Sequence, residues 1–219
     1  MGVLALLATA TVTRAQDFDY DPQRPAELRP CDTHLTHGRA TEARTCYQRL
    51  LTKSKDPATK AEAAWATGNV RQANDLFRQA TGSNDKAVRP RVRWARLYLA
   101  THQYTDAAAL FQEALAINEN DGQAKLGLAN LLSERFEGEA RKLVTELLEN
   151  DDKRTPPNRL LEAHLLSARM DLDEARYDSA EHSLNTAIEI AGQQTQPPLE
   201  AYELLAALDL LKGATTASP

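Results

Sequence analysis

Apolar residues recur every three or four positions along most of the chain, and this spacing predicts helices rather than strands. No segment shows sustained strict alternation of apolar and polar residues, so no strand is expected. Turn-forming runs separate the helical patterns, at residues 56–57, 82–85, 118–121, 156–157 and 197–198. From Pro30 onward the chain is therefore predicted to be a series of helices.

The helical patterns also repeat. In the clearest unit, Ala107 is followed by Phe111 and then by Ala114. Equivalent small residues lie 30, 34, 33 and 40 residues apart, at Ala43, Ala73, Ala107, Ala140 and Ala180. Alanine lets two helix backbones approach closely, and the large residue four positions later fills the gap between neighbouring pairs. Because one helix pair cannot bury its apolar face alone, the pairs are expected to stack.

This pattern resembles the tetratricopeptide repeat (TPR) family, in which each unit of 34 residues contains two antiparallel helices. The second helices carry the matching residues, which are Gly68, Val70, Ala73, Phe77 and Ala80, and Tyr104, Ala107, Phe111 and Ala114. Leu126-Gly127 matches the Leu-Gly pair in the middle of the family's first helix. The resemblance covers about residues 24–213. It implies an all-α, right-handed superhelical α-solenoid of about five helix pairs plus a terminal helix, with the first helices lining a concave groove.

The N-terminal fifteen residues have a different composition. The apolar run from Val3 to Val12 is too short to span a bilayer, and Thr13 and Ala15 are small residues at positions −3 and −1 of a cut after Ala15. We therefore expect a signal peptide (1–15) on an exported protein, periplasmic or secreted; the alternative is an uncleaved tail. An extended lead-in (16–29), a solenoid (30–213) and a disordered tail (214–219) would follow. No later apolar stretch is long enough for a membrane helix.

The two cysteines, Cys31 and Cys46, fall in the two helices of the first predicted repeat. In an exported chain, two cysteines suggest one disulfide, which would brace a terminal repeat that lacks a neighbour on one side. Two alternatives stay open. The cysteines could be buried thiols in core positions, or they could bind a metal together with His34 and His37.

The formal net charge of −5 argues against a general nucleic-acid binder, which needs a strongly basic face. One local cluster is nevertheless basic: Arg89, Arg93 and Arg96 share a helix face. Trp94 and Tyr98 take the packing positions there, so the arginines are expected to face away from the core.

In the TPR family the comparable positions line the groove. The resemblance therefore implies a partner-binding set comprising Arg89, Arg93, Arg96, Lys125, Asn130 and Arg169. Arginines at such positions would bind the carboxylates of an acidic peptide; the alternative is an ordinary solvated face. The chain lacks the full carboxylate clamp of chaperone-binding family members, so chaperone tails are not expected as ligands.

Catalysis has little support in the sequence. There is no glycine-rich phosphate loop, nucleophile elbow or His-Glu-x-x-His motif, and the remaining histidines lie in different repeats. We expect no cofactor and no enzyme activity. The sequence favours a non-catalytic scaffold that binds a peptide or helix in the groove.

Two alternatives to the scaffold remain. The chain could be the N-terminal arm of a larger exported enzyme or assembly, or a metal-binding envelope protein using Cys31, His34, His37 and Cys46. The last predicted helix, 199–212, is also apolar enough to allow self-association.

Overall fold

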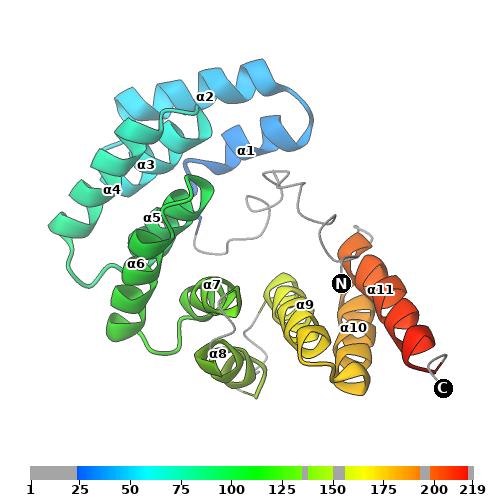
Figure 1. The fold of residues 1–219 in the computed structure, drawn as a ribbon. Coiled ribbons are helices and arrows are strands. Elements are labelled where there is room, and N and C mark those ends of the chain that lie inside the picture. The colour runs from blue at the N-terminus through cyan, green and yellow to red at the C-terminus, as the bar shows by residue number, and fades with distance from the viewer. Residues whose placement is uncertain (1–23, 135–137, 150–155, 193–197, 217–219) are drawn as a thin grey trace. The chain divides into compact units, whose positions relative to one another are not determined.

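The computed structural model describes residues 24–134, 138–149, 156–192 and 198–216. The described residues form eleven helices and no strand, which confirms the predicted all-α fold of helix pairs plus a last helix (Figure 1). The chain forms two compact units, residues 1–103 and 104–219, here called unit 1 and unit 2.

Unit 1 contains α1 (Arg29–Thr36), α2 (Ala40–Lys53), α3 (Pro57–Ala66), α4 (Val70–Ser83) and α5 (Val88–Ala100). Unit 2 contains α6 (Tyr104–Ile117), α7 (Gly122–Ser133), α8 (Gly138–Glu149), α9 (Pro157–Asp173), α10 (Tyr177–Gly192) and α11 (Leu199–Thr216). The odd-numbered helices are the first helices of the pairs, and we call them the A helices. No described helix is both long enough and apolar enough to cross a membrane.

The turn signals of the sequence act as helix caps. The Asp56 carboxylate accepts hydrogen bonds from the backbone N–H groups of Ala58 and Thr59, and Pro57 occupies the first turn of α3. Asp121 caps α7 in the same way, by accepting from the N–H of Ala124 at 2.9 Å.

Four of the described turns share one backbone conformation. Residues with positive φ follow α1, α3, α5 and α9, at Gly38, Gly68, His102 and Ala175. Glycine adopts this conformation freely, whereas His102 (φ 60°) and Ala175 (φ 56°) adopt it at a cost. The register of the turn is therefore kept even where glycine is absent.

The five small residues that define the repeat are all buried, at Ala43, Ala73, Ala107, Ala140 and Ala180. In unit 1, consecutive helices pack side by side and α3 also contacts α5. Ala73 and Phe77 of α4 form one apolar cluster with Ala61 and Ala64 of α3 and Leu97 of α5. The short alanine-rich α3 is consequently buried on most of its surface.

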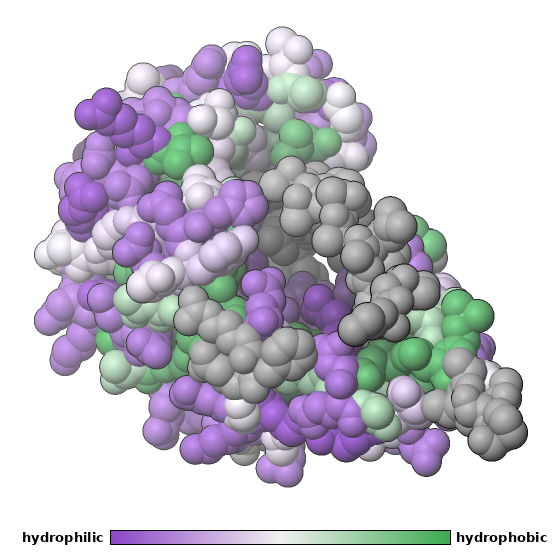
Figure 2. Space-filling model, in the orientation of Figure 1, coloured by the Kyte–Doolittle hydropathy of each residue, from purple (hydrophilic) through white to green (hydrophobic). Residues whose placement is uncertain are grey.

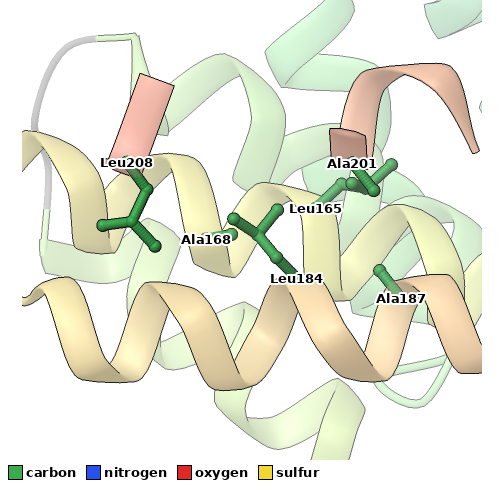
Figure 3. Close-up of a cluster of buried hydrophobic side chains, with 6 residues drawn as sticks. All are labelled: Leu165, Ala168, Leu184, Ala187, Ala201 and Leu208. Carbon is green, nitrogen blue, oxygen red and sulfur yellow. The ribbon is translucent and has the colours of Figure 1, made fainter. Parts of the chain in front are cut away.

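In unit 2 the A helices α7, α9 and α11 contact one another in sequence, while α8 and α10 pack against them. The cluster nearest the C-terminus joins α9, α10 and α11 and consists of Leu165, Ala168, Leu184, Ala187, Ala201 and Leu208 (Figure 3). Gly127 of α7 lies against the ring of Phe111 of α6, and a Cβ atom there would come within 2.3 Å of the ring. The glycine is thus required by close packing.

Two predicted boundaries differ from the structure. Residues 26–28 already form a turn that leads into α1, and Leu28 is buried in its core, so the end of the predicted lead-in belongs to unit 1. At the other end, α11 continues to Thr216 and includes part of the predicted 214–219 tail. No proline interrupts the helix before Pro219. The predicted signal peptide, 1–15, lies outside the described residues.

Candidate interaction surfaces

The predicted basic face of α5 is largely an internal feature of unit 1. Arg93 is only 2% exposed, so the expectation that it faces away from the core is wrong. Its Nε and Nη2 atoms donate to the two carboxylate oxygens of Glu62 on α3, both at 2.8 Å. The Arg93 guanidinium also lies 5.0 Å from the ring of Trp65. A buried carboxylate on another helix, which the spacing within α5 does not reveal, draws Arg93 inward.

Glu62 is fully buried and binds more than one arginine. Arg89 donates to it from Nη2 at 2.9 Å, and Arg24 donates from Nη1 at 3.1 Å. Burial opposes ionisation of the carboxyl group, but the attraction of Arg93, Arg89 and Arg24 outweighs it and lowers the pKa of Glu62 to about 2. Glu62 is therefore a charged group in the core at neutral pH.

A second carboxylate continues this network. Asp32 of α1 is buried and forms a bidentate pair with Arg24, in which Nη2 donates to Oδ1 at 2.7 Å and Nε donates to Oδ2. The Tyr47 hydroxyl of α2 donates to Oδ1 of Asp32 at 2.5 Å. Burial and this hydrogen bond raise the pKa of Tyr47. Burial lowers the pKa of Arg24, but its hydrogen bond to Asp32 and the charges of Glu62 and Asp32 raise it overall.

The repeat pattern of the sequence does not mark Arg24, Asp32 and Glu62 as structural centres. One signal was available for Glu62, because it lies in the run Ala61-Glu62-Ala63-Ala64 of a short helix between two others. A charge in such an alanine-rich position needs a partner if the helix is buried on all sides. No comparable signal marks Arg24, which lies outside the helices.

In unit 2 the predicted groove residues divide into two kinds. Lys125 of α7 is buried and donates to Glu146 of α8 at 2.8 Å, and this bond lowers the pKa of Glu146. Asn130 of α7 is half-buried and donates its amide to the carbonyl of Leu126 at 3.1 Å. The Arg169 side chain of α9 is 46% exposed.

Arg169 links three A helices. Its Nη2 atom lies 3.5 Å from Oδ1 of Asn130, and its Nε atom lies 3.7 Å from Oε1 of Glu200 on α11. These distances are at the long end for direct polar contacts. We call Asn130, Arg169 and Glu200 the A-helix row. Arg96, the one member of the predicted set not yet described, is half-buried on α5 of unit 1.

An open hollow of about 500 Å³ lies between α6, α7 and α8 of unit 2. Its charged lining comprises Glu119, Lys125, Glu139, Lys142 and Glu146. Three carboxylates and two amines meet there, and both amines lie near Glu146, Lys125 at 2.8 Å and Lys142 at 3.9 Å. The hollow is therefore a mixed-charge surface without a strong preference for either sign.

The last helix exposes several apolar side chains. Leu199, Tyr202 and Leu210 of α11 are exposed, with Leu210 at 76%, and Figure 2 shows apolar surface over this helix. Leu208 on the same helix is buried against α9 and α10. The helix is thus apolar on its packed side and also on part of its open side.

The structure brings Cys31 and Cys46 together, with 2.02 Å between the sulfur atoms and 5.3 Å between the Cα atoms. His34 and His37 lie on the same short helix as Cys31, and Nδ1 of His37 is 2.7 Å from the carbonyl of Thr33. Within residues 24–134, 138–149, 156–192 and 198–216, no group of three or more histidine, cysteine or acidic side chains is arranged to hold a metal ion. The four residues do not form a ready metal site.

Comparisons with known proteins agree with this architecture. Residues 92–155 match a family model described as tetratricopeptide repeat. No curated protein sequence matches the chain. Three similar solved structures share 16–17% of the sequence, which at this level shows a common fold.

The first is a thermophilic TPR protein of Thermus thermophilus, with 17% identity, 88% of this chain and 100% of that chain covered, and a TM-score of 0.65. The second is a tetratricopeptide repeat protein from Parabacteroides merdae, with 16% identity, coverages of 85% and 72%, and a TM-score of 0.61. The third is yeast Tom70, with 17% identity, coverages of 85% and 40%, and a TM-score of 0.65.

Proposed function

We propose that the chain is a tetratricopeptide-repeat scaffold, non-catalytic, that binds a protein partner on its A helices; the family model matches residues 92–155, and similar solved structures share the fold. TPR proteins are in general interaction scaffolds, and stacked A helices offer a continuous surface to a peptide or helix. The partner surface that we propose lies in unit 2, on α7, α9 and α11.

The observation that carries this proposal is the A-helix row. Arg169 is about half exposed and reaches Asn130 and Glu200 only at 3.5 and 3.7 Å. A guanidinium held by long contacts can exchange them for the carboxylate of an incoming peptide at little cost, and it binds carboxylates in bidentate fashion. We therefore propose an acidic partner segment that contacts Arg169 and Asn130.

The other predicted groove residues receive a different role. Arg89, Arg93 and Lys125 already bind carboxylates of their own chain. Using them for a partner would take cations away from Glu62 or Glu146, which is costly for the buried Glu62. We assign them to holding the repeats together; Arg96 stays a candidate contact for a partner of unit 1.

The test is a cross-linking pull-down with the full chain as bait, beside Arg169→Glu and Lys142→Glu variants. Both variants change the charge by the same amount on exposed side chains of unit 2, but Lys142 lies on α8 near the hollow. We expect the partner to bind the wild type and the Lys142→Glu variant and to be lost with Arg169→Glu.

Loss with Lys142→Glu alone would move the partner site to the hollow. If neither the wild type nor the variants capture a partner, the scaffold proposal is contradicted, and the hypothesis that the chain is an arm of a larger assembly is favoured. Raising the salt concentration should weaken capture, because exposed charges are screened.

We also propose that the protein is exported and that Cys31 and Cys46 form a disulfide. Export is supported by the apolar run before Ala15, and the disulfide by the distance between the two sulfur atoms. N-terminal sequencing of the secreted chain should begin at Gln16. Intact mass under non-reducing conditions should be lower by two hydrogens than after reduction; equal masses would overturn the disulfide.

Self-association through α11 is a second proposal, and it rests on the exposure of Leu199, Tyr202 and Leu210. Sedimentation at several concentrations tests it. A concentration-dependent dimer that Leu210→Glu removes would support it, and a monomer at every concentration would exclude it.

A further inference from the structure

Two buried carboxylates of unit 1, those of Asp32 and Glu62, bind the same side chain. Asp32 comes from α1 and Glu62 from α3, and the Tyr47 hydroxyl of α2 donates to Asp32. Two helices therefore supply two negative charges to one buried position, and a third helix supplies a hydroxyl group. Such a position needs a cation to be stable.

The cation present there is the guanidinium of Arg24, a residue that precedes the first helix and is only 4% exposed. Two of its nitrogens bind the two oxygens of Asp32, and the third binds Glu62 at 3.1 Å. Carboxylates on two sides match the planar fork of arginine, which presents donors along several edges. A lysine ammonium is a compact point charge and does not reproduce this bidentate geometry.

The two carboxylates depend on Arg24 to different degrees. Glu62 also binds Arg89 and Arg93, so it keeps two cations when Arg24 is removed. Asp32, among the described residues, is paired with no cation other than Arg24, and its remaining partner is the neutral Tyr47 hydroxyl. Without Arg24 the structure would hold a buried carboxylate with one hydrogen bond.

We infer that Asp32, Tyr47 and Glu62 form an arginine-binding pocket, which the chain fills with its own Arg24 as an internal ligand. The ligand class is a guanidinium, and an arginine side chain of a partner peptide would compete with Arg24 for the same pocket. The inference does not depend on the partner surface proposed for unit 2, because every residue of the pocket lies in unit 1.

The first experiment removes the internal ligand and supplies a soluble one. Full-length Arg24→Ala is melted with methylguanidinium or methylammonium at equal concentration, beside the wild type. We expect the variant to melt below the wild type. Methylguanidinium should raise the midpoint of the variant by several degrees and should act no differently from methylammonium on the wild type. Equal effects of the two cations on the variant would overturn the inference.

A matched variant places the effect at the pocket. The double variant Arg24→Ala/Asp32→Asn keeps the space left by Arg24 but removes the charge of Asp32, so the selective effect of methylguanidinium should disappear. If the effect persists, the cation binds elsewhere and the pocket is not the site. If Arg24→Ala does not fold by itself, its refolding yield with each cation gives the same comparison.

The second experiment tests competition directly. N-acetylarginine amide and N-acetyllysine amide are titrated into the wild type and into Arg24→Ala, with binding followed by NMR shifts. We expect the arginine compound to bind Arg24→Ala at least about tenfold more tightly than the lysine compound, because only arginine fits both carboxylates. The wild type should bind neither, since Arg24 occupies the pocket. Equal binding to wild type and variant would contradict the internal ligand.

Discussion

Unit 1 and unit 2 are built from the same kind of helix pair, but they treat buried charge differently. In unit 1, two of the arginines bound to Glu62 are themselves buried, Arg24 at 3% and Arg93 at 2% side-chain exposure, and Arg89 is 14% exposed. Both signs of charge therefore lie largely inside the core. In unit 2 the buried carboxylate of Asp171 binds Arg141 and Arg176, whose side chains are 30% and 41% exposed. Water reaches the arginine partners much more in unit 2 than in unit 1.

This difference teaches where a repeat protein can be changed. Removing a carboxylate whose partners lie partly in water costs little, because the cations left behind remain solvated. A carboxylate whose partners are buried cannot be removed without leaving cations in a medium of low polarity. The network of Glu62 therefore fixes the packing of α3 against α5, whereas α9 and α10 are fixed mainly by leucine and alanine contacts.

The largest expected effect is that of Glu62→Ala. It would leave the buried Arg93 and Arg24 without this carboxylate, and we expect it to destabilise the chain by about 3–5 kcal/mol. Urea unfolding followed by circular dichroism measures the loss, and hydrogen exchange should locate it in α3 and α5. The exposed Glu139→Ala is the control and should stay within about 0.5 kcal/mol of the wild type. A small effect of Glu62→Ala would remove the distinction between the units.

The acid limb of the stability curve is the next test. The pKa of Glu62 is lowered from 4.5 to about 2 on folding, so the unfolded chain takes up the proton first as the pH falls. The contribution of Glu62 is complete above about pH 4.5 and is lost toward about pH 2, and its full size is about 3 kcal/mol. Denaturant titrations across this range should show a flatter pH dependence for Glu62→Gln than for the wild type. Parallel curves would show that Glu62 is not charged in the core.

In unit 2 the comparison predicts sensitivity to shape rather than to charge. A methyl group at position 127 would come within 2.3 Å of the Phe111 ring, so Gly127→Ala should cost about 1–3 kcal/mol. Phe111→Leu places a smaller side chain opposite position 127. In the double variant Gly127→Ala/Phe111→Leu, the added methyl group should therefore destabilise the chain less than it does beside Phe111. A double-mutant cycle in urea measures this coupling. If the changes in the free energy of unfolding simply add, the contact between position 127 and the Phe111 ring does not limit the packing.

The smallest effect is expected for Asp171→Asn. Its arginine partners lie partly in water, so we expect a loss of about 1 kcal/mol, which should shrink as the salt concentration rises. Thermal unfolding at low and high salt measures both quantities. A salt-independent loss as large as that of Glu62→Ala would show that the two units handle charge alike.

The fold could be predicted because its determinants are local and repeated. The spacing of Ala107, Phe111 and Ala114 gives a helix with one small and one large packing position, and each repeat restates the pattern. Caps such as Asp56 and Asp121 mark where helices begin. The direction of the α5 arginines could not be predicted in this way, because it depends on Glu62 in another helix.

The sequence by itself determined the class of fold, the number and rough ends of the helices and the alanines that let them pack. These features rest on interactions between residues less than about ten positions apart, which a periodic pattern records. Only the tertiary structure decided which charges are buried. The buried network joins residues that are far apart in the sequence, up to 38 positions for Arg24 and Glu62. Its members, which also include Asp32 and Arg93, meet because α1, α3 and α5 belong to successive pairs. Burial makes an ion pair strong or costly, and it depends on neighbours that no single helix specifies.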